Sequence, residues 1–182
     1  MTGAAIELRR VDSFDGTAFS ALAESTFGDA VRQQQLEALM GAEAAARHEQ
    51  FRQSLPKTER LRIGAFDGDE LVAYTVGWFE VGGRFYIGSS AVHEAYRGRG
   101  IYTRLMRDVE AAVRERGGIA ISSQHVATNT AVLIAKLKLG YVIAGTEYVE
   151  QMGLLVRLVL HLDPTRRALY AERTGMLTPP AA

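Results

Sequence analysis

The chain has 182 residues, 47% of them apolar, and its 21 basic and 21 acidic side chains leave it with no net charge. This length allows one domain with a real core, whereas the charge balance argues against a general nucleic-acid binder, which needs a basic excess to displace counterions. The sequence lacks cysteine, which excludes disulfides, thiolate metal sites and a cysteine nucleophile. It also lacks an apolar run of membrane-spanning length and a signal-peptide core, so we expect a cytoplasmic protein.

The first half of the chain predicts a strand, a helical region and three antiparallel strands. Residues 4–11 alternate in polarity as a strand does. Residues 17–55 are rich in helix formers with apolar residues at helical spacing, which predicts two or three helices. Breaks between these helices are expected near Gly28 and Gly41. Beyond Pro56 the pattern alternates again, and strands joined by a DGDE turn and a GlyGly pair are expected at residues 61–66, 71–79 and 84–92.

The second half predicts two helices and three further strands. The helices begin at Ile101 and Thr128, and glycine follows each of them. The strands are expected at residues 119–126, 141–150 and 154–162. This order indicates an α/β protein with a central mixed sheet of about seven strands and helices on both faces. Residues 84–126 should form a right-handed crossover between parallel strands.

The domain is expected to span residues 1–164, followed by a polar, partly disordered tail at 165–182. The last strand, LLVRLVLHL, is nearly continuous apolar sequence. Such a strand at a sheet edge invites pairing with another chain. We therefore expect a homodimer.

The segment RGRG at residues 97–100 opens the helix that begins at Ile101. Interleaved arginine and glycine can form a flexible RNA-binding patch, but such patches usually repeat, and this segment occurs once. Glycine at a helix start allows positive φ and a close approach to unpaired N–H groups, which favours a bound pyrophosphate. A capped helix with solvated arginines accounts for the same residues. The motif by itself does not choose between these two structures.

The wider segment VHEAYRGRGIYTRLM resembles the acyl-CoA pyrophosphate loop of the GNAT superfamily of N-acetyltransferases. In that family the loop follows the fourth strand and has the pattern Gln/Arg-x-x-Gly-x-Gly/Ala. Arg97 and Gly100 fit this pattern, as do the flanking Val92 and Leu105. A second segment, NTAVLIAKLKLGY, is similar to the family's Asn…Lys-Leu-Gly-Phe motif, and the resemblance extends over residues 60–160. It implies a GNAT-like acyl-CoA N-acyltransferase fold.

Three positions depart from the family pattern. Glu94 stands where the family has a proline, and Tyr102 stands where the loop ends in a small residue. Lys136 occupies the helix position, seven residues after Asn129, at which many members carry a tyrosine.

The resemblance implies direct transfer of an acetyl group from acetyl-CoA to a primary amine of a small molecule or peptide, between strands 84–92 and 119–126. A backbone N–H near Ala91 would stabilise the developing oxyanion. Asn129 also has a plain explanation as a helix cap. No metal is implied. The implied contacts to acetyl-CoA come from Ala91, Val92, Arg97, Gly98, Arg99, Gly100, Ile101, Tyr102 and Asn129.

Four residues are candidates for the proton transfers. Tyr86 stands where family bases frequently lie, but a phenol with a pKa of about 10 is a poor base at neutral pH, so it is expected to line the acceptor site. Glu80 could act as a base, or it could be a solvated carboxylate at the end of its strand. His125 could also act as a base, or it could be a partly buried histidine that bonds to the backbone. Lys136 could stabilise the departing sulfur or bind a phosphate, but a solvated position on the helix surface is expected first. Other possible acids are Tyr102, Tyr141 and Tyr148.

Two functions remain open from the sequence. An acyl-CoA-dependent N-acetyltransferase is favoured, because positioning alone carries much of an acyl transfer. The alternative is a non-catalytic acyl-CoA-binding or sensor module, which the missing tyrosine and the unassigned base allow. The helical region at 17–55 often caps the acceptor site in such proteins, but it carries no motif that identifies the acceptor.

Overall fold

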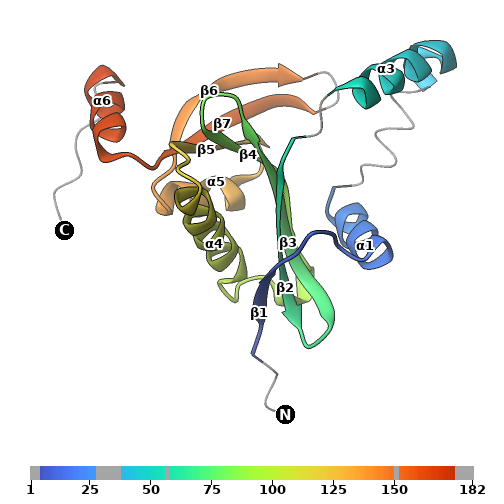
Figure 1. Ribbon diagram of the computed structural model, residues 1–182, viewed down its shortest axis with the longest axis horizontal. Helices are drawn as coiled ribbons and strands as arrows, with labels where there is room; N and C mark the ends of the chain where they lie inside the picture. Colours follow the sequence, from blue (N-terminus) through green and yellow to red (C-terminus); the bar gives the residue numbers. More distant parts are fainter. Residues whose placement is uncertain (1–4, 28–37, 56–57, 150–151, 175–182) are drawn as a thin grey trace.

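The structure, a computed structural model, describes residues 5–27, 38–55, 58–149 and 152–174. Its centre is a seven-stranded sheet in the order β1-β2-β3-β4-β5-β7-β6 (Figure 1). Neighbouring strands are antiparallel except β4 and β5, which are parallel. The mixed sheet and the parallel crossover are therefore confirmed. The strands are β1 (Glu7–Arg10), β2 (Arg60–Asp67), β3 (Glu70–Glu80), β4 (Arg84–Val92), β5 (Ala120–Val126), β6 (Val142–Val149) and β7 (Gly153–His161).

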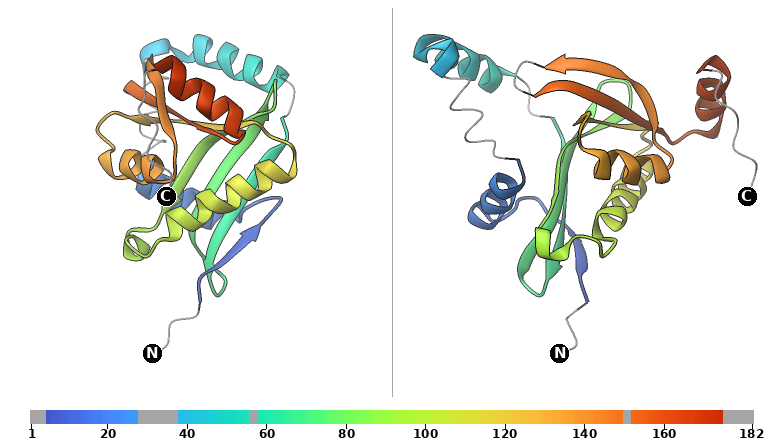
Figure 2. Two further views of the ribbon diagram at one scale, coloured as in Figure 1. Left: turned by 90° about the vertical axis from the view of Figure 1, so that its left-hand side faces the viewer. Right: turned by 180° about the vertical axis from the view of Figure 1, so that it is seen from behind.

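Helices lie on both sides of the sheet (Figures 1 and 2). One face of the sheet contacts α1, which packs on β3 and β4, and the other face contacts α4, which packs on β2, β3 and β4. By contrast, α3 stands away from the sheet and buries none of its residues. The helices are α1 (Gly16–Phe27), α3 (Ala42–Ser54), α4 (Ile101–Glu115), α5 (Thr130–Lys138) and α6 (Pro164–Thr174), with a short 3₁₀ helix, η1, at Glu94–Tyr96.

The main core forms between α4 and the sheet because α4 is amphipathic. Its predicted apolar face is confirmed, and it packs against side chains of the central strands such as Ile63, Phe85 and Ile121. This packing fixes the start of α4 beside the end of β4. The buried residues of α4 are Ile101, Leu105, Met106, Val109, Ala112 and Val113.

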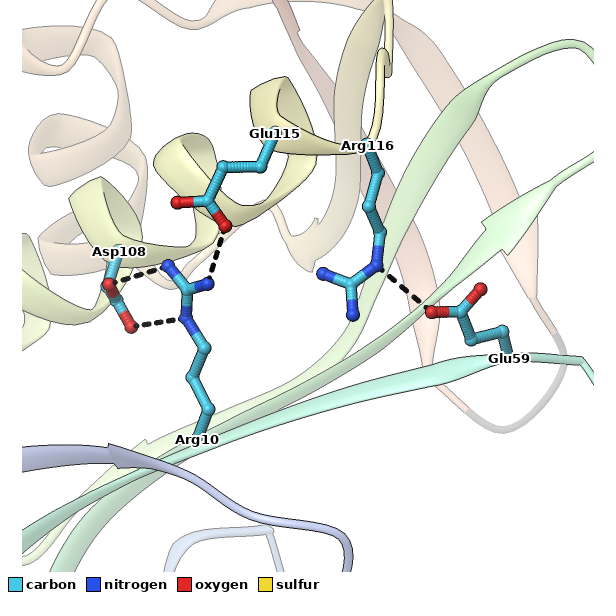
Figure 3. Close-up of polar contacts among 5 residues, drawn as sticks. All are labelled: Arg10, Glu59, Asp108, Glu115 and Arg116. Atoms are coloured by element: carbon cyan, nitrogen blue, oxygen red, sulfur yellow. Dashed lines mark hydrogen bonds and ion pairs between the residues drawn. The ribbon is translucent and has the colours of Figure 1, made fainter.

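Charged side chains join α4 to the strands that it covers (Figure 3). Arg10 of β1 donates hydrogen bonds to Glu115 at 2.7 Å and to Asp108 at 3.2 Å, and Arg116 donates to Glu59 at 3.0 Å. The hydrogen bond from Arg10 lowers the pKa of Glu115. Exposed ion pairs contribute little stability individually. Their effect here is on orientation, since they hold the far end of α4 against β1 and the segment that leads into β2.

One expectation about the end of the chain needs correction. The apolar strand at 154–162 does not lie at a sheet edge, because β7 runs between β5 and β6 and its Leu158 and Leu160 enter the core. Part of the expected tail is the helix α6, whose first turn is capped by Asp163, which accepts a hydrogen bond from the N–H of Arg166 at 3.0 Å. The pair Asp163-Pro164 is a helix-start signal. Residues 175–182 and the expected break at Gly28 lie outside the described residues.

Candidate functional site

The parallel strands β4 and β5 are paired over only part of their lengths. Pairing begins at Arg84 and Ala120 and ends at Ile87 and Ser123. Beyond these residues β4 continues beside β3, whereas β5 continues beside β7, so the two strands separate. We call the divergence between residues 88–92 and residues 124–126 the strand fork, and we call the pair of Ile87 and Ser123 its vertex. Peptide groups on the diverging edges are free of the β4–β5 ladder and can bond to a ligand.

A bulge in β4 accompanies the divergence of the strands. Val76 pairs with Ser89 and Gly77 pairs with Ile87, which leaves Gly88 as the extra residue. A side chain at Gly88 would collide with the ring of Trp78. Glycine is therefore required here, and the bulge bends β4 at the vertex of the strand fork.

The loop after β4 leads directly into the start of α4. Gly98 and Gly100 both adopt φ +75°, and neither has a neighbouring atom within 4 Å of the position that a side chain would occupy. Gly100 is the N-cap residue of α4 and offers no side chain to bond the first N–H groups of the helix. An uncapped helix start with a flexible glycine approach is a ready site for an anion.

Two arginines shape this loop from within. Arg97 donates from Nε to the carbonyl of Val92 at 3.1 Å. Arg99 donates to the carbonyl of Ala95 at 2.9 Å, and its guanidinium lies 4.9 Å from the centre of the Tyr96 ring. Each guanidinium retains further N–H donors. The arginines therefore fix the conformation of the loop as well as adding positive charge to it.

A buried polar cluster lies at the vertex on the side of the sheet that α4 covers. We define this cluster as Tyr102, Ser123, His125, Lys136 and Tyr141. Nζ of Lys136 donates to Oγ of Ser123 at 2.9 Å and lies 4.4 Å from the centre of the Tyr141 ring. Nε2 of His125 lies 3.1 Å from the same Oγ. The hydroxyls of Tyr102 and Tyr141 are buried and have no hydrogen-bond partner within the part of the chain that the structure describes.

The expectation of a solvated Lys136 is wrong. The residue is 0% exposed, and in the described ranges no carboxylate forms an ion pair with it. Burial lowers the pKa of Lys136 to about 7. Both the ammonium and the neutral amine are therefore populated near neutral pH.

The other members of the buried polar cluster keep one protonation state near neutral pH. Burial, followed by the charge of Lys136, lowers the pKa of His125 to about 4, so this imidazole is neutral. Burial raises the pKa of Tyr102 and of Tyr141, so both hydroxyls stay protonated. Lys136 is thus the member of the cluster whose charge changes near pH 7.

Replacing Lys136 by methionine is expected to raise the free energy of unfolding at neutral and lower pH. Methionine keeps the length and packing of the lysine stem but places no charge in the interior. The unfolded lysine has a pKa of about 10.4, above its folded value of about 7. Between about pH 7 and pH 10.4 the lysine is protonated in the unfolded chain but largely neutral in the folded protein. The free energy of unfolding of the wild type therefore increases as pH rises, by at most about 1.4 kcal/mol per pH unit.

The advantage of the Lys136→Met variant should therefore shrink as pH rises from about 7 to about 10. Denaturant unfolding of both proteins across this range measures the difference. Lys138→Met is the matched control, because Lys138 belongs to the same helix and is exposed. A stability difference for Lys136→Met that does not change with pH would contradict the burial of a titrating amine.

The opposite face of the sheet carries Tyr86, because side chains alternate along a strand. The Tyr86 hydroxyl donates to Oε1 of Gln124 at 3.0 Å, and the Gln124 amide donates to Glu147. The Tyr86 ring lies 4.9 Å from that of Trp78. Burial raises the pKa of Tyr86, and the charges of Glu80 and Glu147 act in the same direction. This phenol is therefore no base at neutral pH. We call these five residues the Tyr86 face.

The four candidates for proton transfer are thus divided between two faces. Tyr86 and Glu80 belong to one, and His125 and Lys136 belong to the other. Among the other possible acids, Tyr102 and Tyr141 join the buried polar cluster, whereas Tyr148 is 74% exposed on β6. Three residues that hold these faces together are not apparent from the sequence: Ser123, Gln124 and Glu147. Alternation along β5 groups Ser123 with His125, but the approach of Glu147 depends on where β6 lies.

The expected ligand-binding residues differ in what they can offer. Ala91 and Ile101 bury their side chains in the core, so only their backbone groups can contact a ligand. The carbonyl of Val92 already accepts one hydrogen bond from Arg97. Asn129 caps α5, and its side chain accepts a bond from the N–H of Val132 at 3.4 Å. Its role as a helix cap is confirmed.

Within the ranges 5–27, 38–55, 58–149 and 152–174, no group of three or more His, Asp or Glu side chains is arranged to hold a metal ion. None of the helices in these ranges is long and apolar enough to cross a membrane.

Residues 28–141 match the family model described as Acetyltransferase (GNAT) family. A search of curated proteins gave no match. The fold is similar to an aminoglycoside 6'-N-acetyltransferase complexed with coenzyme A, at 20% identity and a TM-score of 0.60, over 87% of this chain and 98% of that chain. It is also similar to the ribosomal-protein-S18-alanine N-acetyltransferase from Escherichia coli, at 13% identity and a TM-score of 0.63, over 87% and 95% of the two chains.

Nourseothricin acetyltransferase is similar over a smaller part, at 17% identity and a TM-score of 0.53, with 57% of this chain and 66% of that chain covered. The present chain therefore spans about two thirds of that enzyme. The family match extends through β4, the loop, α4 and β5, which together form the strand fork and the start of α4. The chain belongs to the acetyltransferase (GNAT) family.

Proposed function

We propose that the chain binds acetyl-CoA along the strand fork and transfers its acetyl group directly to a primary amine of a small molecule or peptide. One observation supports this proposal: β4 and β5 separate at a vertex where Ser123 accepts a hydrogen bond from a buried lysine, and the loop after β4 leads into a helix start without a side-chain cap. The residues fit such a donor. Gly98 and Gly100 leave open space above the loop, and two buried tyrosine hydroxyls still lack partners in the described chain.

The donor's phosphates would be held at the start of α4. Backbone N–H groups from Gly98 to Tyr102 supply the hydrogen bonds, and Arg97 and Arg99 supply charge. The strand edge at Ala91 and Val92 would pair with the donor's amide groups, and the Val92 carbonyl has a second lone pair for this purpose. One N–H of this edge would stabilise the oxyanion that develops during transfer.

The two faces of the sheet suit the two partners of an acyl transfer. Acetyl-CoA supplies an activated acetyl group in a thioester. The Tyr86 face receives the attacking amine, and the buried polar cluster lies on the side of the departing sulfur. The ammonium form of Lys136 would stabilise the thiolate there and donate a proton to it. This arrangement gives Lys136 the position that a tyrosine holds in many members of the family.

The Tyr86 face suits an acceptor that carries positive charge. Trp78 and Tyr86 form an aromatic wall, and the carboxylates of Glu80 and Glu147 are close enough to raise the pKa of the phenol. Aromatic faces and carboxylates both attract an ammonium ion. We assign Glu80 as the group that accepts the amine's proton through water, since His125 belongs to the other face.

The proposal is tested by measuring thiol release from acetyl-CoA with a panel of polyamines, aminoglycosides and peptides. Turnover with an amine, together with saturable CoA binding by calorimetry, supports an N-acetyltransferase that acts on that class. Saturable CoA binding without turnover on any amine would support the non-catalytic module instead.

We also propose a homodimer that acts in the cytoplasm, where acetyl-CoA is available. At this end of the sheet the edge strand is β6 rather than β7, and residues 143–148 of β6 are exposed. An open edge can pair with the same edge of a second copy. Light scattering at micromolar concentration is expected to give twice the chain mass of 19.9 kDa. A mass equal to that of one chain would refute the dimer.

A further inference from the structure

We propose that the protein acetylates its own Lys136 when acetyl-CoA is bound and no acceptor amine is present. The inference rests on the proposed binding of acetyl-CoA along the strand fork. It adds a modification site to that function. The donor itself would then inactivate the enzyme, because acetylation removes the ammonium of Lys136.

The position of the amine is the first argument. Nζ of Lys136 lies 2.9 Å from Oγ of Ser123, and Ser123 belongs to the last β4–β5 pair before the strands separate. The amine is therefore at the vertex, where a donor lying along the strand fork with its phosphates at α4 would bring its thioester. A bound thioester and a fixed amine react as one molecule, which removes the entropic cost of encounter.

The surroundings of the amine are the second argument. In the described residues the partners of Nζ are one hydroxyl and the face of the Tyr141 ring, and no carboxylate forms an ion pair with it. The titratable groups nearest to it are His125 on β5 and Tyr141 before β6, and Tyr102 on α4 lies beyond Tyr141; all three are neutral near pH 7. A desolvated lysine of this kind exposes its lone pair at neutral pH and becomes a nucleophile.

The chemical step is balanced with the donor alone. The lone pair of Nζ forms a bond to the acetyl carbonyl carbon, and the C–S bond breaks with its electron pair on sulfur. The nitrogen loses one proton, which the thiolate takes up, so the products are acetylated Lys136 and coenzyme A. An amide is a much weaker acyl donor than a thioester, so the acetyl group stays on the lysine.

The polarity of the product also suits the cluster. Acetylation removes the charge that is costly to bury, and it adds a carbonyl oxygen to a site where the hydroxyls of Tyr102 and Tyr141 lack acceptors. The modified enzyme has no ammonium to stabilise a departing thiolate. Acetylation of Lys136 therefore removes a buried charge and lowers turnover together.

The chain is well suited to a direct test, because its lysines are only Lys57, Lys136 and Lys138. The full-length protein is incubated with acetyl-CoA without any amine, and the acetylated peptide is identified by mass spectrometry over time. We expect one acetyl group on Lys136, at a rate per molecule that does not depend on protein concentration. Lys138→Met should label as the wild type does, and Lys136→Met should lose this label.

Two further measurements separate the possible failures. At acetyl-CoA concentrations below saturation, Lys136 in the Gly100→Val variant should be acetylated more slowly than in the wild type. The rate should fall by the same factor by which the Kd for CoA rises. This dependence distinguishes reaction in the site from chemical acetylation in solution. Calorimetry reports donor binding independently. Saturable binding of acetyl-CoA with an unmodified Lys136 would overturn self-acetylation and leave the transferase proposal standing, and so would acetylation confined to Lys57 and Lys138. Absence of CoA binding would overturn both.

Discussion

Replacing Gly100 by valine is expected to weaken CoA binding by roughly ten- to a hundred-fold while the fold survives. Gly100 adopts φ +75°, a conformation that a β-branched residue rarely takes. No atom lies within 4 Å of the position of its missing side chain, so the variant suffers backbone strain without a collision. Relief of that strain turns the N–H groups at the start of α4 away from the phosphates, and calorimetry with CoA measures the loss.

Gly117→Val is the matched control for this variant. Gly117 follows the other end of α4, has φ +73°, and is likewise open within 4 Å. The two substitutions therefore impose similar strain at opposite ends of one helix. Equal CoA affinity in the two variants would show that the start of α4 does not bind the phosphates.

Replacing Lys136 by methionine is expected to lower turnover by about ten- to over a hundred-fold, with little change in KM for acetyl-CoA. The loss of one charge-assisted hydrogen bond costs roughly 1.5–3 kcal/mol, and the cost appears in turnover if the bond forms mainly in the transition state. Steady-state kinetics with a saturating amine, once the assay has identified one, measures both constants. Because the same variant should be more stable at pH 7, loss of activity cannot be attributed to unfolding.

Lys138→Met again provides the comparison, since its helical position differs from that of Lys136 by about 200°. A raised KM with unchanged turnover in Lys136→Met would assign Lys136 to a phosphate contact instead. Equal and small effects of the two substitutions would remove Lys136 from the chemistry. Tyr102 and Tyr141 would then be the acids to test, because they share its cluster.

The sequence was most informative where local geometry decides the structure. Glycines with positive φ mark the start of α4 at Gly100 and the end of that helix at Gly117, and the apolar spacing along α4 correctly predicted the face that it buries. These features depend on residues within a few positions of one another. The loop and the element order could therefore be predicted without tertiary contacts.

The environment of Lys136 could not be predicted in this way. On α5 the apolar residues Ile134 and Leu137 are 48% and 43% exposed, whereas Lys136 is buried. This is the reverse of the order that hydropathy predicts, because Ser123 on β5 and Tyr141 before β6 enclose this face of the helix. The prediction that the last strand lies at a sheet edge failed for the same reason. The order of strands along the chain does not determine their order in the sheet, where β7 lies between β5 and β6.

The separation of the Tyr86 face from the buried polar cluster has a consequence for how such an enzyme can change. In the proposed arrangement Trp78, Gln124 and Glu147 would contact the acceptor on one side of the sheet, and none of them belongs to the loop or to the cluster that would hold the donor. Substitutions among these three can redirect the choice of amine while the acetyl-donating half continues to operate unaltered. Natural or laboratory evolution can thus change the acceptor of this enzyme without changing the residues that bind the donor.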